Sequence, residues 1–289
     1  MKTKGRRYIN TIMLVVKQYQ KLSCSGKTAA ALLLLVLTIA LFAGLLSPYP
    51  HNIPSGKALQ PPSAAHWLGT DDLGIDIWTQ ICHGARLSIC VGISTALLAG
   101  FGGCMIGMVA GYFGGLTDRV VMRLTDLMIV LPDLPMMIVL GAFFGPSIMN
   151  IILVLTLFSW TAPARIVRSR ILTMKQEKFI TAARSYGAGF FHLASRHFLP
   201  GILPLVAVSI IRLTGRAIVA EASLSFLGLG DPTSKSWGLI LNYAVHFKGI
   251  YFTEFWKWWV TAPLVAIILV VAAIAVLARE CEKLVNSKL

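Results

Sequence analysis

The chain has 289 residues, of which 56% are hydrophobic and only 13% are charged, and its formal net charge at pH 7 is +14. A soluble globular domain usually carries about 25% charged residues, so this composition excludes an ordinary water-soluble protein. The basic residues fall between long apolar blocks rather than on a surface with interleaved exposed aromatics. That distribution is typical of the positive-inside rule of membrane proteins and not of nucleic-acid binding.

The first 27 residues contain seven Lys or Arg and no acidic residue, and an apolar block follows at 28–47. A signal peptide has a shorter apolar core of about 7–15 residues and a small-residue cleavage site. We therefore expect a cytoplasmic N-terminal segment, 1–27, and an uncleaved first membrane span. The stretch that follows, about 48–84, is rich in Pro and Gly and is expected to form an external loop.

Five more apolar blocks follow, and each is long enough to predict a membrane span. They lie at about 86–111, 120–144, 148–164, 201–222 and 258–278. The second block is rich in glycine, which suits close helix packing in lipid, and Pro132 and Pro135 interrupt the third. The pattern predicts an all-α membrane protein with six transmembrane helices over residues 28–280.

The distribution of positive charge predicts the orientation. The segments on one side (1–27, 112–123, 165–196 and 279–289) hold nineteen Lys or Arg, whereas the loops on the other side hold four. The positive-inside rule then places both termini in the cytoplasm. We expect a multi-pass protein of the cytoplasmic (inner) membrane, with Trp256, Trp258 and Trp259 in an aromatic belt at the outer face.

The basic loop 165–200 carries the clearest functional signal. Within it Phe179, Ala182, Ala183 and Tyr186 recur at the spacing of one apolar helix face, and Gly187 follows as a C-terminal stop. Such a helix fits a groove on a partner protein, but periodicity alone equally allows a helix on anionic lipid headgroups. Leu199 and Pro200 are expected to open the next span.

The same loop resembles the EAA loop of ABC importer permeases, on the matches Ala182, Ala183, Gly187, Leu199 and Pro200. Thr181 stands where the family usually has Glu. The resemblance implies that the helix around Thr181–Tyr186 docks on a partner ATPase, with Phe179 and Tyr186 in its apolar face. Because Thr181 lacks a carboxylate, the contact should depend on apolar packing more than on a salt bridge.

Two further stretches resemble the dipeptide/oligopeptide/nickel permeases within this family: His66–Asp76, and Ala220–Gly230 after the fifth span. The likeness covers about 28–280 and is typical of the second of two permease subunits. It implies the type I ABC importer permease architecture with a cytoplasmic coupling helix. The implied partners are a second homologous permease, two cytoplasmic ATP-binding subunits, an extracytoplasmic solute-binding protein and the lipid bilayer.

The chain has no Walker A pattern, so ATP and Mg are expected to be used by the partner ATPases, and we expect no catalytic site and no cofactor in this chain. Neither the histidines nor the five cysteines show metal-ligand spacing, and Asp71, Asp72 and Asp76 are interpreted as a structural turn and not as a Ca²⁺ site. The solute, whether a peptide, nickel or a metal chelate, is not determined by the sequence.

Three charged residues of the fifth span are candidates for the translocation path: Arg212, Arg216 and Glu221. Ionisable groups at membrane depth are costly and often line a pathway, although the two arginines could instead extend to the headgroups. An alternative function is a stand-alone secondary transporter or channel, in which Asp126 and Asp133 would form a relay. A membrane scaffold without transport is a third class. The docking loop favours the importer subunit over a secondary transporter, and a scaffold would leave the Gly-rich second span unexplained.

Overall fold

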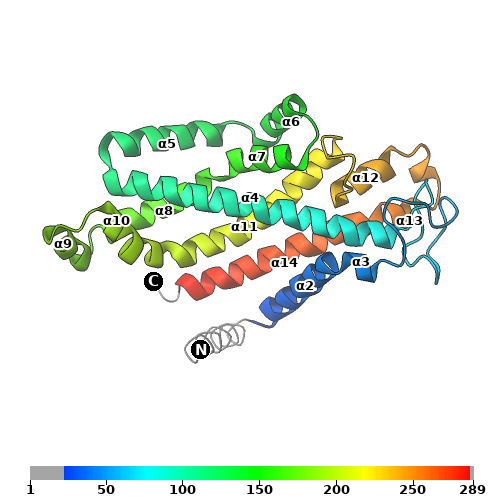
Figure 1. Ribbon diagram of the computed structural model, residues 1–289, viewed down its shortest axis with the longest axis horizontal. Helices are drawn as coiled ribbons and strands as arrows, with labels where there is room; N and C mark the ends of the chain where they lie inside the picture. The colour runs from blue at the N-terminus through cyan, green and yellow to red at the C-terminus, as the bar shows by residue number, and fades with distance from the viewer. Residues whose placement is uncertain (1–22, 287–289) are drawn as a thin grey trace.

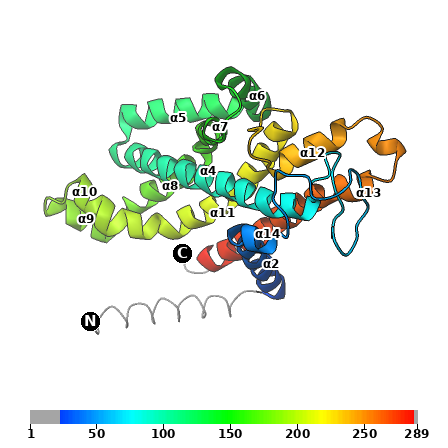
Figure 2. The same cartoon turned by 45° about the vertical axis from the view of Figure 1, so that its right-hand side comes forward.

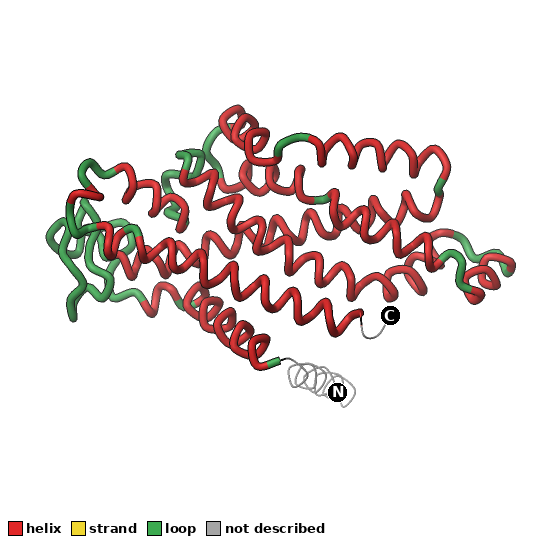
Figure 3. The backbone as a smooth tube through the Cα atoms, turned by 180° about the vertical axis from the view of Figure 1, so that it is seen from behind, coloured by secondary structure: helices red, strands yellow, loops and turns green. Residues whose placement is uncertain are grey.

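A computed structural model describes residues 23–286 of the chain, and this part is a bundle of helices (Figures 1 and 3) with no β-strand between those two residues. The basic segment predicted for residues 1–27 therefore lies mostly outside the described residues. The helices are α2 (Cys24–Leu41), α3 (Ala43–Leu46), α4 (Ile77–Phe113), α5 (Gly115–Val130), α6 (Asp133–Phe144), α7 (Ile148–Ser159), α8 (Thr161–Met174), α9 (Lys178–Ser185), α10 (Phe190–Leu193), the π turn η1 (Ala194–Phe198), α11 (Leu199–Phe226), α12 (Trp237–His246), the 3-10 turn η2 (Ile250–Phe252), α13 (Trp256–Trp259) and α14 (Thr261–Asn286).

Helix α4 is the central element of the bundle (Figure 1). The Asp76 carboxylate caps its first turn by accepting a hydrogen bond from the Thr79 N–H at 2.8 Å. Its glycines allow the backbones of neighbouring helices to approach: Gly92 faces α11, whereas Gly103 and Gly107 face α8. Gly102, one of the glycines predicted to pack, has no atom within 4 Å of a Cβ placed there. Gly92, Gly103 and Gly107 therefore lie where neighbouring helices pack closely against α4, as small residues commonly do in membrane proteins.

The third apolar block is two helices and not one straight span. Helices α5 and α6 meet at an angle of 90° at a break of a few residues. Leu131 and Pro132 have extended backbone at the break, because the proline ring disfavours the helical conformation of the residue before it. Pro135 lies in the first turn of α6, where backbone N–H groups have no helical partner, and it is tolerated there.

Within residues 23–286, length and apolar composition identify five helical segments that could cross a membrane: Cys24–Leu41, Ile77–Phe113, Ile148–Met174, Phe190–Phe226 and Trp256–Val285. The α5–α6 pair makes a sixth if it counts as one span. The helices extend beyond the predicted blocks. The second begins at Ile77 and not near residue 86, and the fourth continues through α8, because helix continues into the polar regions beyond an apolar core.

The two ends of the bundle differ, as Figures 1 and 2 show. We call the end that holds residues 47–76 and 227–255 the loop end, and the opposite end, from which α9 projects, the α9 end. Helix α14 packs against both α11 and α2, and α2 lies along it on the outside of the bundle (Figure 2). The long helices thus run from the α9 end of the bundle to its loop end.

Candidate coupling segment and solute cavity

Helix α9 is joined to the bundle by one fully buried side chain. Ile180 is 0% exposed and lies in a cluster of apolar residues from five other helical segments: Cys104, Met108, Val167, Ile171, Met174, Leu193, Phe198, Ile202 and Val206. Ala183, one turn later, is half-buried against the same cluster. This inward face was only partly recognised in the sequence, where Ala183 was grouped with the outward residues and Ile180 was missed. Ile180 and Ala183 are three residues apart and so lie on one face of a helix, which is the sequence pattern that could have identified this inward face.

The end of α9 is fixed by its backbone. Gly187 has a φ of +87°, and its N–H donates to the Arg184 carbonyl at 2.9 Å while the Ala188 N–H donates to the Ala183 carbonyl at 3.0 Å. These two hydrogen bonds, together with the left-handed conformation of Gly187, make a Schellman motif. The predicted short helix with a glycine stop is therefore confirmed, with bounds Lys178–Ser185.

A second set of contacts links this segment to the end of α4. The Lys175 ammonium donates to the carbonyls of Gly111 and Tyr112 at 3.1 and 2.8 Å, which satisfies acceptors that a helix C-terminus leaves open. The Tyr112 ring lies 4.9 Å from that of Phe190, and the Arg184 guanidinium lies 5.9 Å from the Tyr112 ring centre. A force on α9 would therefore reach α4 directly.

The outward face of α9 is apolar and largely uncovered, and its contact with the rest of the described residues is that of the Phe179 ring, which lies 5.6 Å from the His197 ring. Phe179 is 49% exposed and Tyr186 is 92% exposed, and Ala182 between them is also exposed. Thr181 is exposed as well, and its hydroxyl donates weakly to the Glu177 carbonyl at 3.3 Å. An exposed aromatic pair on a fixed helix is the arrangement expected of a docking surface.

The rest of the predicted loop is more helical than expected. Helix α8 extends to Met174, so Arg165, Arg168 and Arg170 lie within a helix. Helix α11 begins at Leu199 with Pro200 in its first turn, but helical structure already starts at Phe190 and reaches α11 through η1 without a break. Leu199 and Pro200 thus open α11 as expected, but the residues before them are helical and do not form a loop. The π turn ends at Phe198, two residues before Pro200, which cannot donate an N–H to the helix.

Two ion pairs join α5 to α8. The Arg168 guanidinium donates to both carboxylate oxygens of Asp118, with Nε–Oδ1 at 2.6 Å, and Arg165 pairs with Asp126. Asp126, considered in the sequence as part of a proton relay, is thus paired with an arginine of the neighbouring helix. The two contacts hold the start of the bent segment against the helix that leads to α9.

A cavity of about 900 Å³ lies among α5, α6, α7, α8, α11 and α14. Arg212 and Arg216 line it, together with Asp133 and Arg279 and otherwise mainly apolar side chains. Arg212 forms an ion pair with Glu282 of α14, whereas Arg216 is exposed and has no ion pair within residues 23–286. The two arginines therefore lie where a solute could contact them.

Glu221 lies apart from this cavity. It is 2% exposed, and its carboxylate accepts hydrogen bonds from Ser225 at 2.7 Å and from Ser88 of α4 at 3.2 Å. Ser88 also accepts a bond from the Trp237 N–H at 3.4 Å, at the start of α12. Glu221 thus connects α11, α4 and α12 and does not line this cavity, because the helix turns it away from the face that carries the arginines.

The acidic residues of the loop end have structural partners. Asp71 Oδ1 accepts from the N–H groups of Leu73 and Ile75 at 2.9 and 2.8 Å, and Asp76 pairs with His66 at 2.9 Å while it caps α4. These contacts confirm the interpretation of Asp71 and Asp76 as parts of a turn. Burial and the neighbouring Asp71 raise the pKa of Asp72. No group of three or more His, Cys, Asp or Glu suited to a metal occurs in the described residues.

These features define a class of protein: a multi-pass helical membrane protein with a lined cavity and a projecting helix. Its family follows from comparison with known proteins. Residues 103–288 match the family described as the binding-protein-dependent transport system inner membrane component, and the chain belongs to that family. It is a permease subunit of an ABC importer with the type I permease fold.

The chain is similar to named transport proteins over most of its length. It is 38% identical to the glutathione transport system permease protein GsiD of Pectobacterium atrosepticum, over 75% of this chain and 73% of that protein. It is 37% identical to the dipeptide transport system permease protein DppC of Bacillus subtilis, over 73% of this chain and 67% of the relative. GsiD of Escherichia coli is 37% identical over 75% of this chain and 73% of its own length.

Proposed function

We propose that this chain forms half of the path of an ATP-driven importer for small peptide-like solutes. The observation that carries the proposal is the pairing of an outward apolar face on α9 with the buried Ile180 that fixes α9 to α4, α8 and α11. A partner ATPase that grips Phe179, Ala182 and Tyr186 would move the ends of these helices as one unit. Such rigid-body coupling is a common way to switch access in transporters.

The proposed complex has the partners that the family resemblance implies. A second homologous permease would close the cavity that holds Arg212 and Arg216, two cytoplasmic ATP-binding subunits would use ATP and Mg, and an extracytoplasmic protein would deliver the solute. In this arrangement the α9 end and both termini face the cytoplasm, in accord with the excess of Lys and Arg in those segments. Thr181 in place of the usual Glu leaves the apolar face to provide most of the contact.

A peptide-like solute fits the charges of the cavity. Three guanidinium groups, those of Arg212, Arg216 and Arg279, line it with the single carboxylate of Asp133. A peptide carries a C-terminal carboxylate at neutral pH, and arginine recognises carboxylates with two parallel hydrogen bonds. Relatives named for glutathione and dipeptide transport support this solute class over nickel or a metal chelate.

The test uses the full complex, purified through an affinity tag on this chain. Tyr186→Ala combined with Phe179→Ala should release the ATP-binding subunits while the second permease stays bound. Phe252→Ala is the matched control, because Phe252 is an aromatic that is 96% exposed at the opposite, loop end. Undiminished recovery of the ATPase with the double variant would refute the role of α9.

A further inference from the structure

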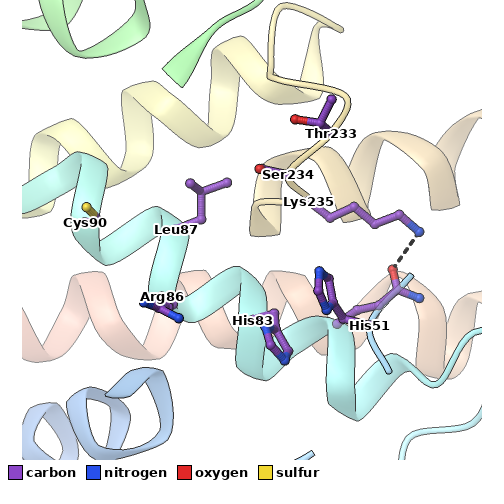
Figure 4. A pocket seen from close by; sticks show the side chains of 9 residues that line it. His51, His83, Arg86, Leu87, Cys90, Thr233, Ser234 and Lys235 are labelled. Atoms are coloured by element: carbon purple, nitrogen blue, oxygen red, sulfur yellow. Dashed lines mark hydrogen bonds between the residues drawn. The ribbon is translucent and has the colours of Figure 1, made fainter. Parts of the chain in front are cut away.

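A pocket of about 250 Å³ lies at the loop end beside the first turns of α4 (Figure 4). Three sequence segments that are far apart line it: residue 51 of the first loop, one face of α4, and the residues just before α12. The lining residues are His51, Gln80, His83, Arg86, Leu87, Cys90, Thr233, Ser234 and Lys235. The family resemblance and the coupling segment give this pocket no role.

The side chains of the pocket carry an excess of positive charge. Arg86 is exposed and forms no ion pair with any residue of 23–286. The rings of His51 and His83 stack beside it with centroids 4.3 Å apart. Lys235 is partly engaged, since its ammonium donates to Gln80 at 3.2 Å and lies 3.6 Å from Asp71. Asp231, close to the lining residue Thr233 in the chain, accepts a hydrogen bond from the Thr233 hydroxyl at 2.6 Å.

The pocket lies at the end of an exposed apolar stripe. His83, Arg86 and Cys90 share one face of α4, and the same face continues through the large apolar side chains of Ile93, Leu97, Phe101 and Met105, which are 38 to 55% exposed. The stripe from Cys90 to Met105 rises by about 22 Å at 1.5 Å per residue. The apolar part of a bilayer is about 30 Å thick, so the basic end of the stripe falls near the headgroup level.

This face of α4 is directed away from the solute cavity. The residues that line that cavity come from α5, α6, α7, α8, α11 and α14, and none comes from α4. A face that is apolar along the helix and remote from the path is suited to contact lipid chains. The basic residues that terminate it are then positioned to meet the polar groups of the same lipids.

We propose that this pocket binds a phosphate group, and its position favours the headgroup phosphate of an anionic phospholipid as the source. The Arg86 guanidinium donates two parallel hydrogen bonds to phosphate oxygens, a geometry in which arginine is particularly strong. The imidazoles of His51 and His83 and the Ser234 hydroxyl add donors around it. Leu87 and Cys90 contact the glycerol and the first acyl carbons. The site holds the loop end at a fixed depth while the α9 end moves.

The experiment uses the full-length chain purified in detergent and native mass spectrometry to count bound ligand. The chain is titrated separately with phosphatidylglycerol, with zwitterionic phosphatidylcholine and with inorganic phosphate. Arg86→Gln is expected to weaken retention of phosphatidylglycerol about tenfold or more, because it removes a charge-assisted pair. Lys248→Gln is the matched control, since Lys248 is an exposed basic residue of the loop end that does not line the pocket.

Each outcome decides part of the proposal. Loss of phosphatidylglycerol in Arg86→Gln, with wild-type retention in Lys248→Gln, supports a lipid site. If inorganic phosphate binds with the same dependence on Arg86 and the lipid does not, the pocket binds phosphate but the lipid source is wrong. Equal retention of both ligands by the wild-type chain and Arg86→Gln overturns the site. Arg86→Lys and His83→Gln serve if Arg86→Gln does not fold: intermediate weakening supports the site, and unchanged retention refutes it.

Discussion

Ile180→Ala is the substitution that most directly tests how α9 is held. Ile180 is 0% exposed, and its neighbours belong to α4, α8, α10, η1 and α11. Truncating a buried isoleucine to alanine usually costs about 2–5 kcal/mol, because apolar contacts are lost and a cavity remains. Helix α9 has only eight residues, and isolated helices of that length are not stable in water. The loss should therefore appear as local detachment of α9 and not as unfolding of the bundle.

A loss of about 3 kcal/mol corresponds to a change of about 150-fold in the equilibrium between attached and detached α9. The backbone amides of Thr181–Tyr186 should then exchange with deuterium roughly that much faster, while the amides of α4 and α11 keep their protection. Hydrogen–deuterium exchange of the full-length chain, read by mass spectrometry, measures this effect without any partner present.

Two matched variants bracket the expected effect. Ile180→Val keeps most of the side chain and should cost about 0.5–1.5 kcal/mol, and Phe179→Ala removes an aromatic that is 49% exposed and should leave the exchange of α9 nearly unchanged. If the α9 amides of Ile180→Ala exchange at the wild-type rate, Ile180 does not hold the segment. The proposed coupling of α9 to α4, α8 and α11 through Ile180 would then be wrong.

Other substitutions test the helix contacts. Gly103→Leu should lower the thermal unfolding temperature in detergent and Gly102→Leu should not, because only Gly103 faces the backbone of α8. Gly187→Ala should cost about 1 kcal/mol of stability at the end of α9, because φ is +87° although a Cβ there meets no atom within 4 Å. Hydrogen–deuterium exchange of the amides at the end of α9 measures this cost, and Gly187→Asn should cost less. Arg168→Lys loses the bidentate contact with Asp118 and should lower the stability of the protein by about 1 kcal/mol, because the pair is partly exposed. A double-mutant cycle with Asp118→Asn, measured by thermal unfolding, checks this. A coupling energy of zero would show that the pair contributes nothing.

Local patterns in the sequence determine much of the architecture. Apolar block length predicts the spans because a bilayer leaves a backbone few options other than a helix, and the short α9 with its Gly187 stop follows from helix periodicity and from the left-handed conformation that glycine permits. The family resemblance of the loop and of residues 220–230 likewise needed no coordinates. Where the prolines would bend the chain was visible, but not that α5 and α6 would meet at 90°.

The tertiary structure decided which side of each helix is used. Periodicity grouped Ala183 with Phe179 and Tyr186, yet the packed cluster takes Ala183 and Ile180 inward and leaves the two aromatics exposed. Likewise Arg216 and Glu221 lie close together in the sequence, but one lines the cavity and the other is buried against Ser88. A sequence gives the angle between residues on one helix, and only the neighbouring helices determine which angle faces the core, the lipid or the path.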